Sequence, residues 1–113
     1  MKAQAAIQSL GALAQEHRLA VFRQLVQAGE RGMAAGAIAE ALGIANSSLS
    51  FHLAQLRAAG LILQERQHRS LIYRANYPAM NGLLAYLTEN CCEGRACTSD
   101  VACLTADAER KSA

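Results

Sequence analysis

The chain has 113 residues, of which 52% are hydrophobic and only 4% aromatic, and its formal net charge is +2. This length fits one domain with a short extension, and the composition, which includes a single Pro, favours mostly helix. The sequence has no run of 18 apolar residues and no signal peptide, so we expect a cytoplasmic protein with no membrane partner.

Two helices are predicted at the start of the chain, over 3–14 and 15–28, from the helical spacing of their apolar residues. One face of the first helix carries Ile7, Leu10 and Leu13. The buried stripe of the second helix consists of Leu19, Phe22, Leu25 and Val26. Because so short a chain buries only about two-thirds of its unfolded surface, we expect the apolar ends of the chain to support dimerisation.

A helix-turn-helix is predicted next, with helices over 34–42 and 46–59. Gly43 supplies the left-handed backbone that ends the first of these helices. Asn46 or Ser47 can accept hydrogen bonds from the free N–H groups that open the second. The residues expected to bury one side of the first helix are Ile38, Ala41 and Leu42. The core stripe of the second helix is Leu49, Leu53 and Leu56.

Small polar residues and one Phe occupy the outer face of this second helix. A helix with one apolar stripe and short outer side chains can lie in the DNA major groove. The residues that we assign to DNA contact on this helix are Asn46, Ser47, Ser48, Ser50, Phe51 and Gln55. Phe51 lies about 200° around the helix from Leu49, so it points away from the core and can pack on a thymine methyl. The alternative is a helical hairpin inside another kind of small domain.

A β-hairpin is predicted over 61–67 and 70–77, because both segments are rich in β-branched and aromatic residues and a short polar turn separates them. The hairpin residues that we assign to DNA are Arg66, His68 and Arg69, which suit phosphates or the minor groove. The hairpin also holds Arg74, while Tyr73 is expected in the core. Residues 1–77 contain eight Lys or Arg against four Glu, so the basic part of the chain coincides with these elements.

Pro78 can open a final helix. Its apolar face consists of Met80, Leu83, Leu84 and Leu87. The helical period is lost after Asn90.

Two histidines lie in the predicted helices, and they do not form a pair at the spacing of metal ligands. His52 is close to the edge of the leucine stripe, where we expect it to bond a backbone group beside the core. His17 is expected at the surface.

The order helix, helix, helix-turn-helix, hairpin, helix is that of a winged helix-turn-helix protein. The strings LAQEHRLAVFRQLV, AIAEALGIANSSLSFHLAQLRAAGLI and QERQHRSLIYRA resemble the ArsR/SmtB family of metal-responsive repressors, over residues 10–90. The resemblance implies a mainly α fold with four to five helices and a two-stranded hairpin wing. It also implies a homodimer, joined through the first and last helices, that binds operator double-stranded DNA. We therefore divide the chain into a DNA-binding and dimerisation domain, 1–90, and a cysteine-containing tail, 91–113, and we expect no enzyme.

All four cysteines fall between Cys91 and Cys103. In a reducing compartment, clustered cysteines are more often ligands or redox groups than disulfides. Two metal positions common in the family are absent here: a paired-Cys motif in the first helix of the helix-turn-helix and a His/Asp set along the last helix. The string NCCEGRAC instead resembles a branch of arsenic-responsive repressors. This resemblance implies a ligand triad of Cys91, Cys92 and Cys97, with Cys103 as an additional thiol and an alternative ligand.

Soft thiolates select thiophilic ions, and trivalent arsenic binds three sulfurs as a pyramid. We therefore expect As(III) as the inducer, with Sb(III) suited to the same site, and release of the operator when the ion binds. Other interpretations stay open: another thiophilic ion such as Cd, Pb, Zn or Cu, a structural four-cysteine zinc site, a thiol-redox response, or no ligand at all.

Overall fold

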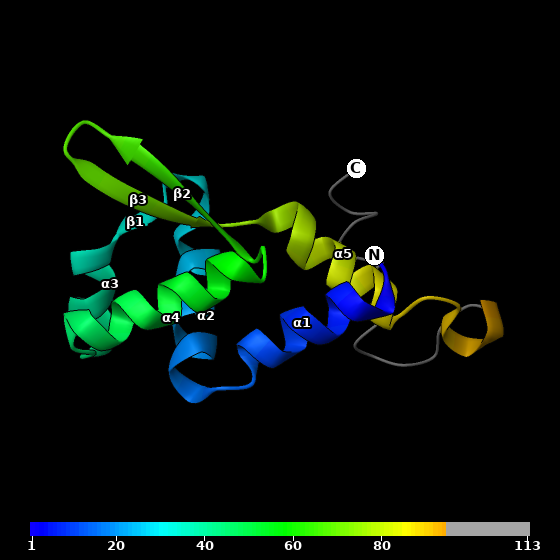
Figure 1. Ribbon diagram of the computed structural model, residues 1–113. Coiled ribbons are helices and arrows are strands. Elements are labelled where there is room, and N and C mark those ends of the chain that lie inside the picture. Colours follow the sequence, from blue (N-terminus) through cyan, green and yellow to red (C-terminus); the bar gives the residue numbers. More distant parts are fainter. Residues whose placement is uncertain (95–113) are drawn as a thin grey trace.

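The computed structural model describes residues 1–94, in which helices surround a small antiparallel sheet (Figure 1). The elements in chain order are α1 (Ala3–Leu13), α2 (Glu16–Ala28), η1 (Gly29–Arg31), β1 (Met33–Ala34), α3 (Ala35–Leu42), α4 (Asn46–Ala58), β2 (Ile62–Gln67), β3 (Ser70–Ala75), α5 (Tyr77–Leu87) and η2 (Cys91–Gly94). Every predicted helix and both predicted strands are present, and most of their ends shift by one or two residues. The last helix ends at Leu87, three residues before the end of the predicted helical period at Asn90. The mainly α, winged helix-turn-helix fold is confirmed.

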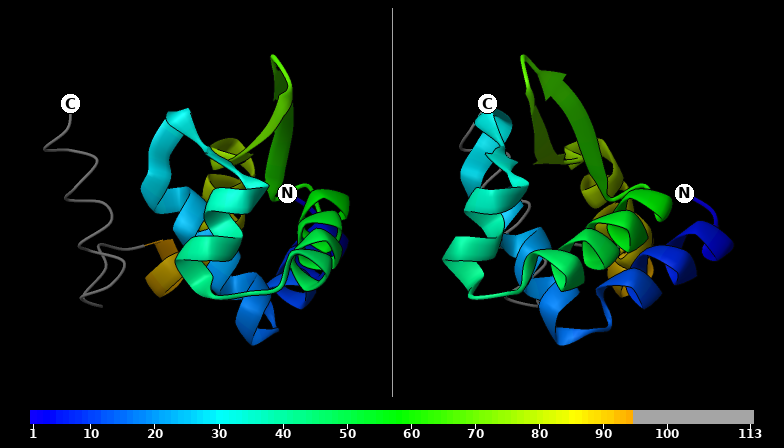
Figure 2. Two further views of the ribbon diagram at one scale, coloured as in Figure 1. Left: turned by 90° about the vertical axis from the view of Figure 1, so that its left-hand side faces the viewer. Right: turned by 60° about the vertical axis from the view of Figure 1, so that its left-hand side comes forward.

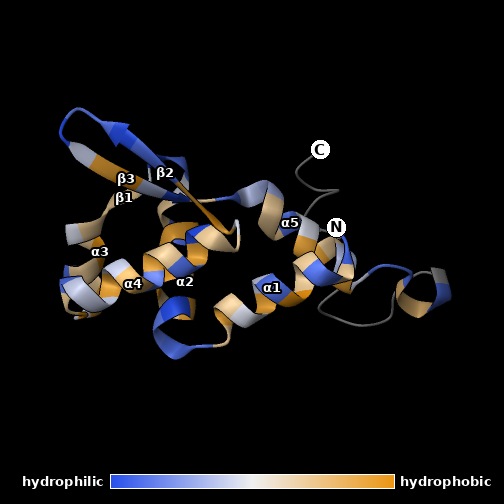
Figure 3. Ribbon diagram, viewed as in Figure 1, coloured by the Kyte–Doolittle hydropathy of each residue, from blue (hydrophilic) through white to orange (hydrophobic). Residues whose placement is uncertain are grey.

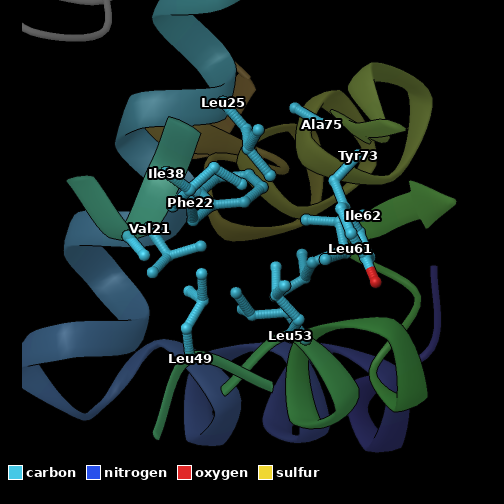
Figure 4. Close-up of a cluster of buried hydrophobic side chains, with 12 residues drawn as sticks. Val21, Phe22, Leu25, Ile38, Leu49, Leu53, Leu61, Ile62, Tyr73 and Ala75 are labelled. Atoms are coloured by element: carbon cyan, nitrogen blue, oxygen red, sulfur yellow. The ribbon is translucent and has the colours of Figure 1, made fainter. Parts of the chain in front are cut away.

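The core lies where α2, α3 and α4 meet the base of the hairpin formed by β2 and β3 (Figure 4). Its buried side chains include Val21, Phe22, Leu25, Ile38, Leu49, Leu53, Leu56, Leu61, Ile62, Tyr73 and Ala75. The predicted leucine stripe of α4 and the core position of Tyr73 are therefore confirmed. Each fully buried leucine contributes about 1.5–3 kcal/mol relative to an exposed one, so the stripe fixes which face of α4 turns outward.

Two predicted core positions are wrong. Leu19 of α2 is 44% exposed, and Ala41 of α3 is exposed while its neighbour Ala39 is buried. Each of these residues lies roughly 110° around its helix from the centre of the buried face. The packing of α2 centres on Val21 and Leu25, which the sequence pattern alone does not distinguish from a face that includes Leu19.

The sheet has a third strand that the sequence did not predict. Its order is β1-β3-β2, and β1 pairs antiparallel with β3, with Met33 opposite Tyr73. Gly32 allows this pairing because a Cβ atom there would lie 2.5 Å from the carbonyl oxygen of Tyr73, and because its φ is +69°. A strand of two residues is too short to produce a recognisable alternating pattern.

Side-chain hydrogen bonds fix the start of α5 against the rest of the domain. Asn76 caps the helix and donates from Nδ2 to the carbonyl oxygen of Gly60 at 2.9 Å. The hydroxyl of Tyr77 donates to the carbonyl oxygen of Val26 at 2.9 Å, which ties α5 to α2. Pro78 lies in the first turn, as predicted.

The wing stands apart from the first and last of the described α-helices. The hairpin projects away from the helical body in each view, while α1 and α5 lie on the side away from α3 (Figures 1 and 2). Colouring by hydropathy shows a hydrophilic wing tip above an apolar hairpin base (Figure 3). Among residues 1–94, no helix is both long enough and apolar enough to cross a bilayer.

Candidate nucleic-acid interface

The outer face of α4 presents the residues that the sequence assigned to DNA contact. All six are exposed: Asn46, Ser47, Ser48, Ser50, Phe51 and Gln55. Phe51 is the one large apolar side chain among them and is 57% exposed. Gly43, with φ of 65°, turns the chain between α3 and α4 as predicted. A helix held by three buried leucines thus offers short polar side chains and one aromatic ring to a groove.

The predicted capping of α4 is wrong. The helix begins at Asn46, and the N-cap residue is Ala45, whose backbone is extended and which provides no side-chain hydrogen bond. Asn46 and Ser47 lie inside the first turn, so their side chains remain exposed. Among residues 1–94, the first N–H groups of α4 therefore have no side-chain acceptor. A helix N-terminus of this kind favours an anionic partner such as a phosphate.

The wing tip is a two-residue turn between Gln67 and Ser70, which are paired across the hairpin. His68 in this turn has a left-handed backbone, with φ of 57°. The three tip residues assigned to DNA are exposed: Arg66, His68 and Arg69. They are therefore placed as the contact to phosphates requires.

Arg74 differs from these tip residues because its guanidinium forms an ion pair with a carboxylate. Its Nη2 is 2.8 Å from Oε2 of Glu65, and both side chains are partly exposed. Gln67 donates to the other oxygen of the same carboxylate at 3.0 Å. Surface pairs of this kind contribute little stability, but this pair occupies the guanidinium of Arg74.

His52 differs from its prediction. It is half-buried, and its Nδ1 is buried with no hydrogen-bond partner, so the expected bond to a backbone group is absent from residues 1–94. The ring of the exposed His17 lies beside it, with 5.6 Å between the ring centroids. Burial lowers the pKa of His52, and the nearby charges of Arg18 and His17 lower it further. No sequence pattern predicts this contact, because the two residues come from different helices.

The described part of the cysteine segment brings two thiols together. Cys91 and Cys92 lie in η2, and their Sγ atoms are 3.5 Å apart. The backbone turns here through left-handed conformations at Cys92 and Glu93, with φ of 57° and 58°. Cys97 and Cys103 lie outside the described residues, and residues 1–94 contain no group of three or more His, Cys, Asp or Glu that could hold a metal ion.

Comparison with known proteins agrees with this architecture. A helix-turn-helix domain family matches residues 13–65. The nodulation protein NolR of Rhizobium meliloti is 34% identical over 80 residues, which cover 71% of this chain and 63% of NolR, so the match spans less than two-thirds of that relative. The HTH-type transcriptional regulator YgaV of Escherichia coli K12 is 31% identical over 83 residues, which cover 74% of this chain and 82% of YgaV.

A solved structure extends the similarity to the fold. The ArsR-like transcriptional regulator from Rhodococcus sp. RHA1 superimposes with a TM-score of 0.67 at 25% identity, over 74% of this chain and 76% of that one. These relatives are regulators rather than enzymes. The chain therefore belongs to the ArsR family of winged helix-turn-helix, DNA-binding transcriptional regulators.

Proposed function

We propose that this protein is a homodimeric transcriptional repressor that leaves its operator when trivalent arsenic or antimony binds Cys91, Cys92 and Cys97. The observation that carries the proposal is the distance of 3.5 Å between the Sγ atoms of Cys91 and Cys92. Bonds of about 2.3 Å from thiolates to one ion put two sulfurs roughly 3.3–3.8 Å apart when the angle at the ion is about 90–110°. The two thiols therefore need little movement to share an ion.

A third thiolate would complete a pyramidal site. Cys97 follows Cys92 by five residues, a spacing that lets a short loop bring its thiol to the same ion. Cys103 is the alternative ligand. Because the thiols must lose protons before they bind, the affinity for the ion should fall as pH falls. Soft ligands of this kind favour As(III), Sb(III) or another thiophilic ion over a hard cation.

Exposed apolar side chains on the first and last helices support the homodimer. Ile7 and Leu10 of α1 are 70% and 43% exposed, and Leu84 and Leu87 of α5 are 49% and 53% exposed. A single chain thus leaves large apolar residues in water on two helices that contact each other. A second copy would cover these residues and place two α4 helices against successive major-groove segments, about 34 Å apart.

The thiol pair is attached to the same turn of α5 that carries this apolar surface. The backbone N–H of Cys91 donates to the carbonyl oxygen of Thr88 at 3.0 Å. Thr88 in turn bonds the carbonyl oxygen of Leu84 through Oγ1 at 2.8 Å. Ordering of the thiolates around an ion would act on this helix end and change the spacing of the two α4 helices. Coupling between two such sites is typically about 1–3 kcal/mol, or 5- to 150-fold in affinity.

The test is the affinity of the dimer for a duplex that the wild-type protein selects from a random pool, measured with increasing arsenite, antimonite, cadmium or zinc. We expect arsenite and antimonite to weaken binding at lower concentrations than zinc does. Equal or stronger release by zinc would contradict the three-thiolate site, since zinc prefers four ligands.

A further inference from the structure

A groove runs between the C-terminal half of α4 and the first strand of the wing, with a volume of about 480 Å³. Its lining residues are Ala54, Arg57, Ala58, Ile62, Leu63 and Gln64. One of them is cationic and none is acidic, so the groove favours an anionic occupant. The sequence did not assign any of these six residues to DNA contact.

Arg57 is the charged group of this groove and is available for a ligand. It is exposed in the last turn of α4, and among residues 1–94 its guanidinium has no ion-pair or hydrogen-bond partner. The contrast is Arg74 on the neighbouring strand, which Glu65 holds at 2.8 Å. The guanidinium of Arg57 can therefore form the two parallel hydrogen bonds with which Arg recognises a phosphate.

The walls of the groove suit a sugar–phosphate strand. Ala54 and Ala58 are exposed and short, so the backbone of α4 can be approached closely. Leu63, which is 45% exposed, offers an apolar contact for a deoxyribose. Gln64 donates one N–H to the hydroxyl of Tyr73 at 3.0 Å, which orients its amide and leaves the carbonyl oxygen and the second N–H available.

The position of the groove identifies which part of the DNA it would meet. A winged domain that places α4 in a major groove and its hairpin near the adjacent minor groove must straddle the strand that separates the two grooves. In this structure the hairpin stands beside α4 (Figure 2), with the groove between them. We propose that the groove holds this sugar–phosphate strand and that Arg57 binds one of its phosphates as a positioning residue. This inference rests on the proposed DNA binding.

The expected effect follows from counterion release. Each phosphate neutralised by an Arg adds about 0.9 to the slope of log affinity against log salt concentration. Loss of one contact should weaken binding about fivefold near 0.15 M salt, since 0.15 raised to the power −0.9 is about 5.5. Because phosphates carry no sequence information, the loss should be equal for specific and non-specific duplexes.

The experiment compares Arg57→Ala with wild type on two fluorescent duplexes of about 30 base pairs, one selected by the wild-type protein and one of random sequence. Anisotropy titrations between about 0.05 and 0.2 M salt give the slopes. Arg23→Ala is the matched control, because Arg23 is exposed on α2 while Val21 and Leu25 on the opposite face are buried. We expect Arg57→Ala to lower both affinities about fivefold and both slopes by about one, with Arg23→Ala unchanged.

A second variant guards against an indirect effect of the Ala substitution. Arg57→Lys keeps the charge, and we expect it to retain most of the slope while losing part of the affinity. Unchanged slopes in Arg57→Ala, or a loss confined to the selected duplex, would overturn the phosphate contact. Failure of the wild-type protein to bind either duplex would instead overturn the proposed DNA binding itself.

Discussion

Phe51 is predicted to contact the methyl group of one thymine in the operator. It is 57% exposed on the outer face of α4. Among the aromatic rings of the described residues, only that of His52 lies beside it, in a T-shaped arrangement with 5.8 Å between the ring centroids. An exposed Phe in a helix that enters the major groove can cover the C5 methyl of a thymine. Burying one such carbon contributes about 0.8 kcal/mol, which corresponds to roughly a fourfold change in affinity.

The assay replaces each thymine of the selected duplex in turn with deoxyuridine, which lacks only that methyl. For wild type we expect one position per half-site to lose about fourfold in affinity on this replacement. For Phe51→Ala the same replacement should have no effect, because the methyl then has no partner. The coupling between the two changes, measured as a double-mutant cycle, isolates this contact from the rest of the interface.

If Phe51→Ala and wild type respond identically to every deoxyuridine, Phe51 reads no thymine methyl. If Phe51→Ala also lowers the free energy of unfolding by more than about 1 kcal/mol, its ring packs within the protein, since exposed positions normally change stability by less than about 0.5 kcal/mol.

Three further predictions concern the wing, the histidine pair and the sheet. Arg66→Ala or Arg69→Ala should each lower the salt slope of DNA binding by about one. Arg74→Ala should leave the slope unchanged, because a carboxylate already holds that guanidinium. An equal loss of slope in all three variants would contradict the distinction between the two tip arginines and Arg74. The lowered pKa of His52 means that the unfolded chain binds more protons, so the stability of wild type should fall as pH drops below about 6.5. Urea unfolding at several pH values should show a smaller fall in stability for His52→Gln than for wild type. An identical fall would show that His52 is not the group responsible. Gly32→Ala should lower the free energy of unfolding by more than about 2 kcal/mol, because left-handed backbone costs Ala about 1–2 kcal/mol and the new Cβ also collides with β3; a smaller loss in thermal unfolding would show that β1 is not held closely.

The helix-turn-helix and the hairpin were predictable because each has a strong local signal. Leu49, Leu53 and Leu56 repeat at helical spacing, and Gly43 marks the turn before them. These signals arise because each element buries one face, so its apolar residues recur at the period of a helix or a strand. They therefore also place the six exposed residues of α4 correctly.

Contacts between distant elements were not predictable in the same way. His17 and His52 meet only because α2 packs across α4, and β1 exists only because Gly32 lets the chain approach β3. The pairing of Arg74 with Glu65 could have been predicted, because a two-residue turn at 68–69 puts both side chains on one face of the hairpin. Positions outside residues 1–94, including Cys97 and Cys103, remain predictions.

The central claim is that a cysteine site releases DNA, and the most direct measurement is the anisotropy of a bound, selected duplex during an arsenite titration of Cys→Ser variants. We predict that arsenite lowers the affinity of wild type by about 5- to 150-fold. Serine at Cys91, Cys92 or Cys97 should abolish this response and leave DNA binding without arsenite unchanged, and serine at Cys103 should preserve the response. An intact response in Cys92→Ser, or loss of the response only in Cys103→Ser, would contradict the ligand assignment, and a wild-type dimer that arsenite does not dislodge would contradict the claim as a whole.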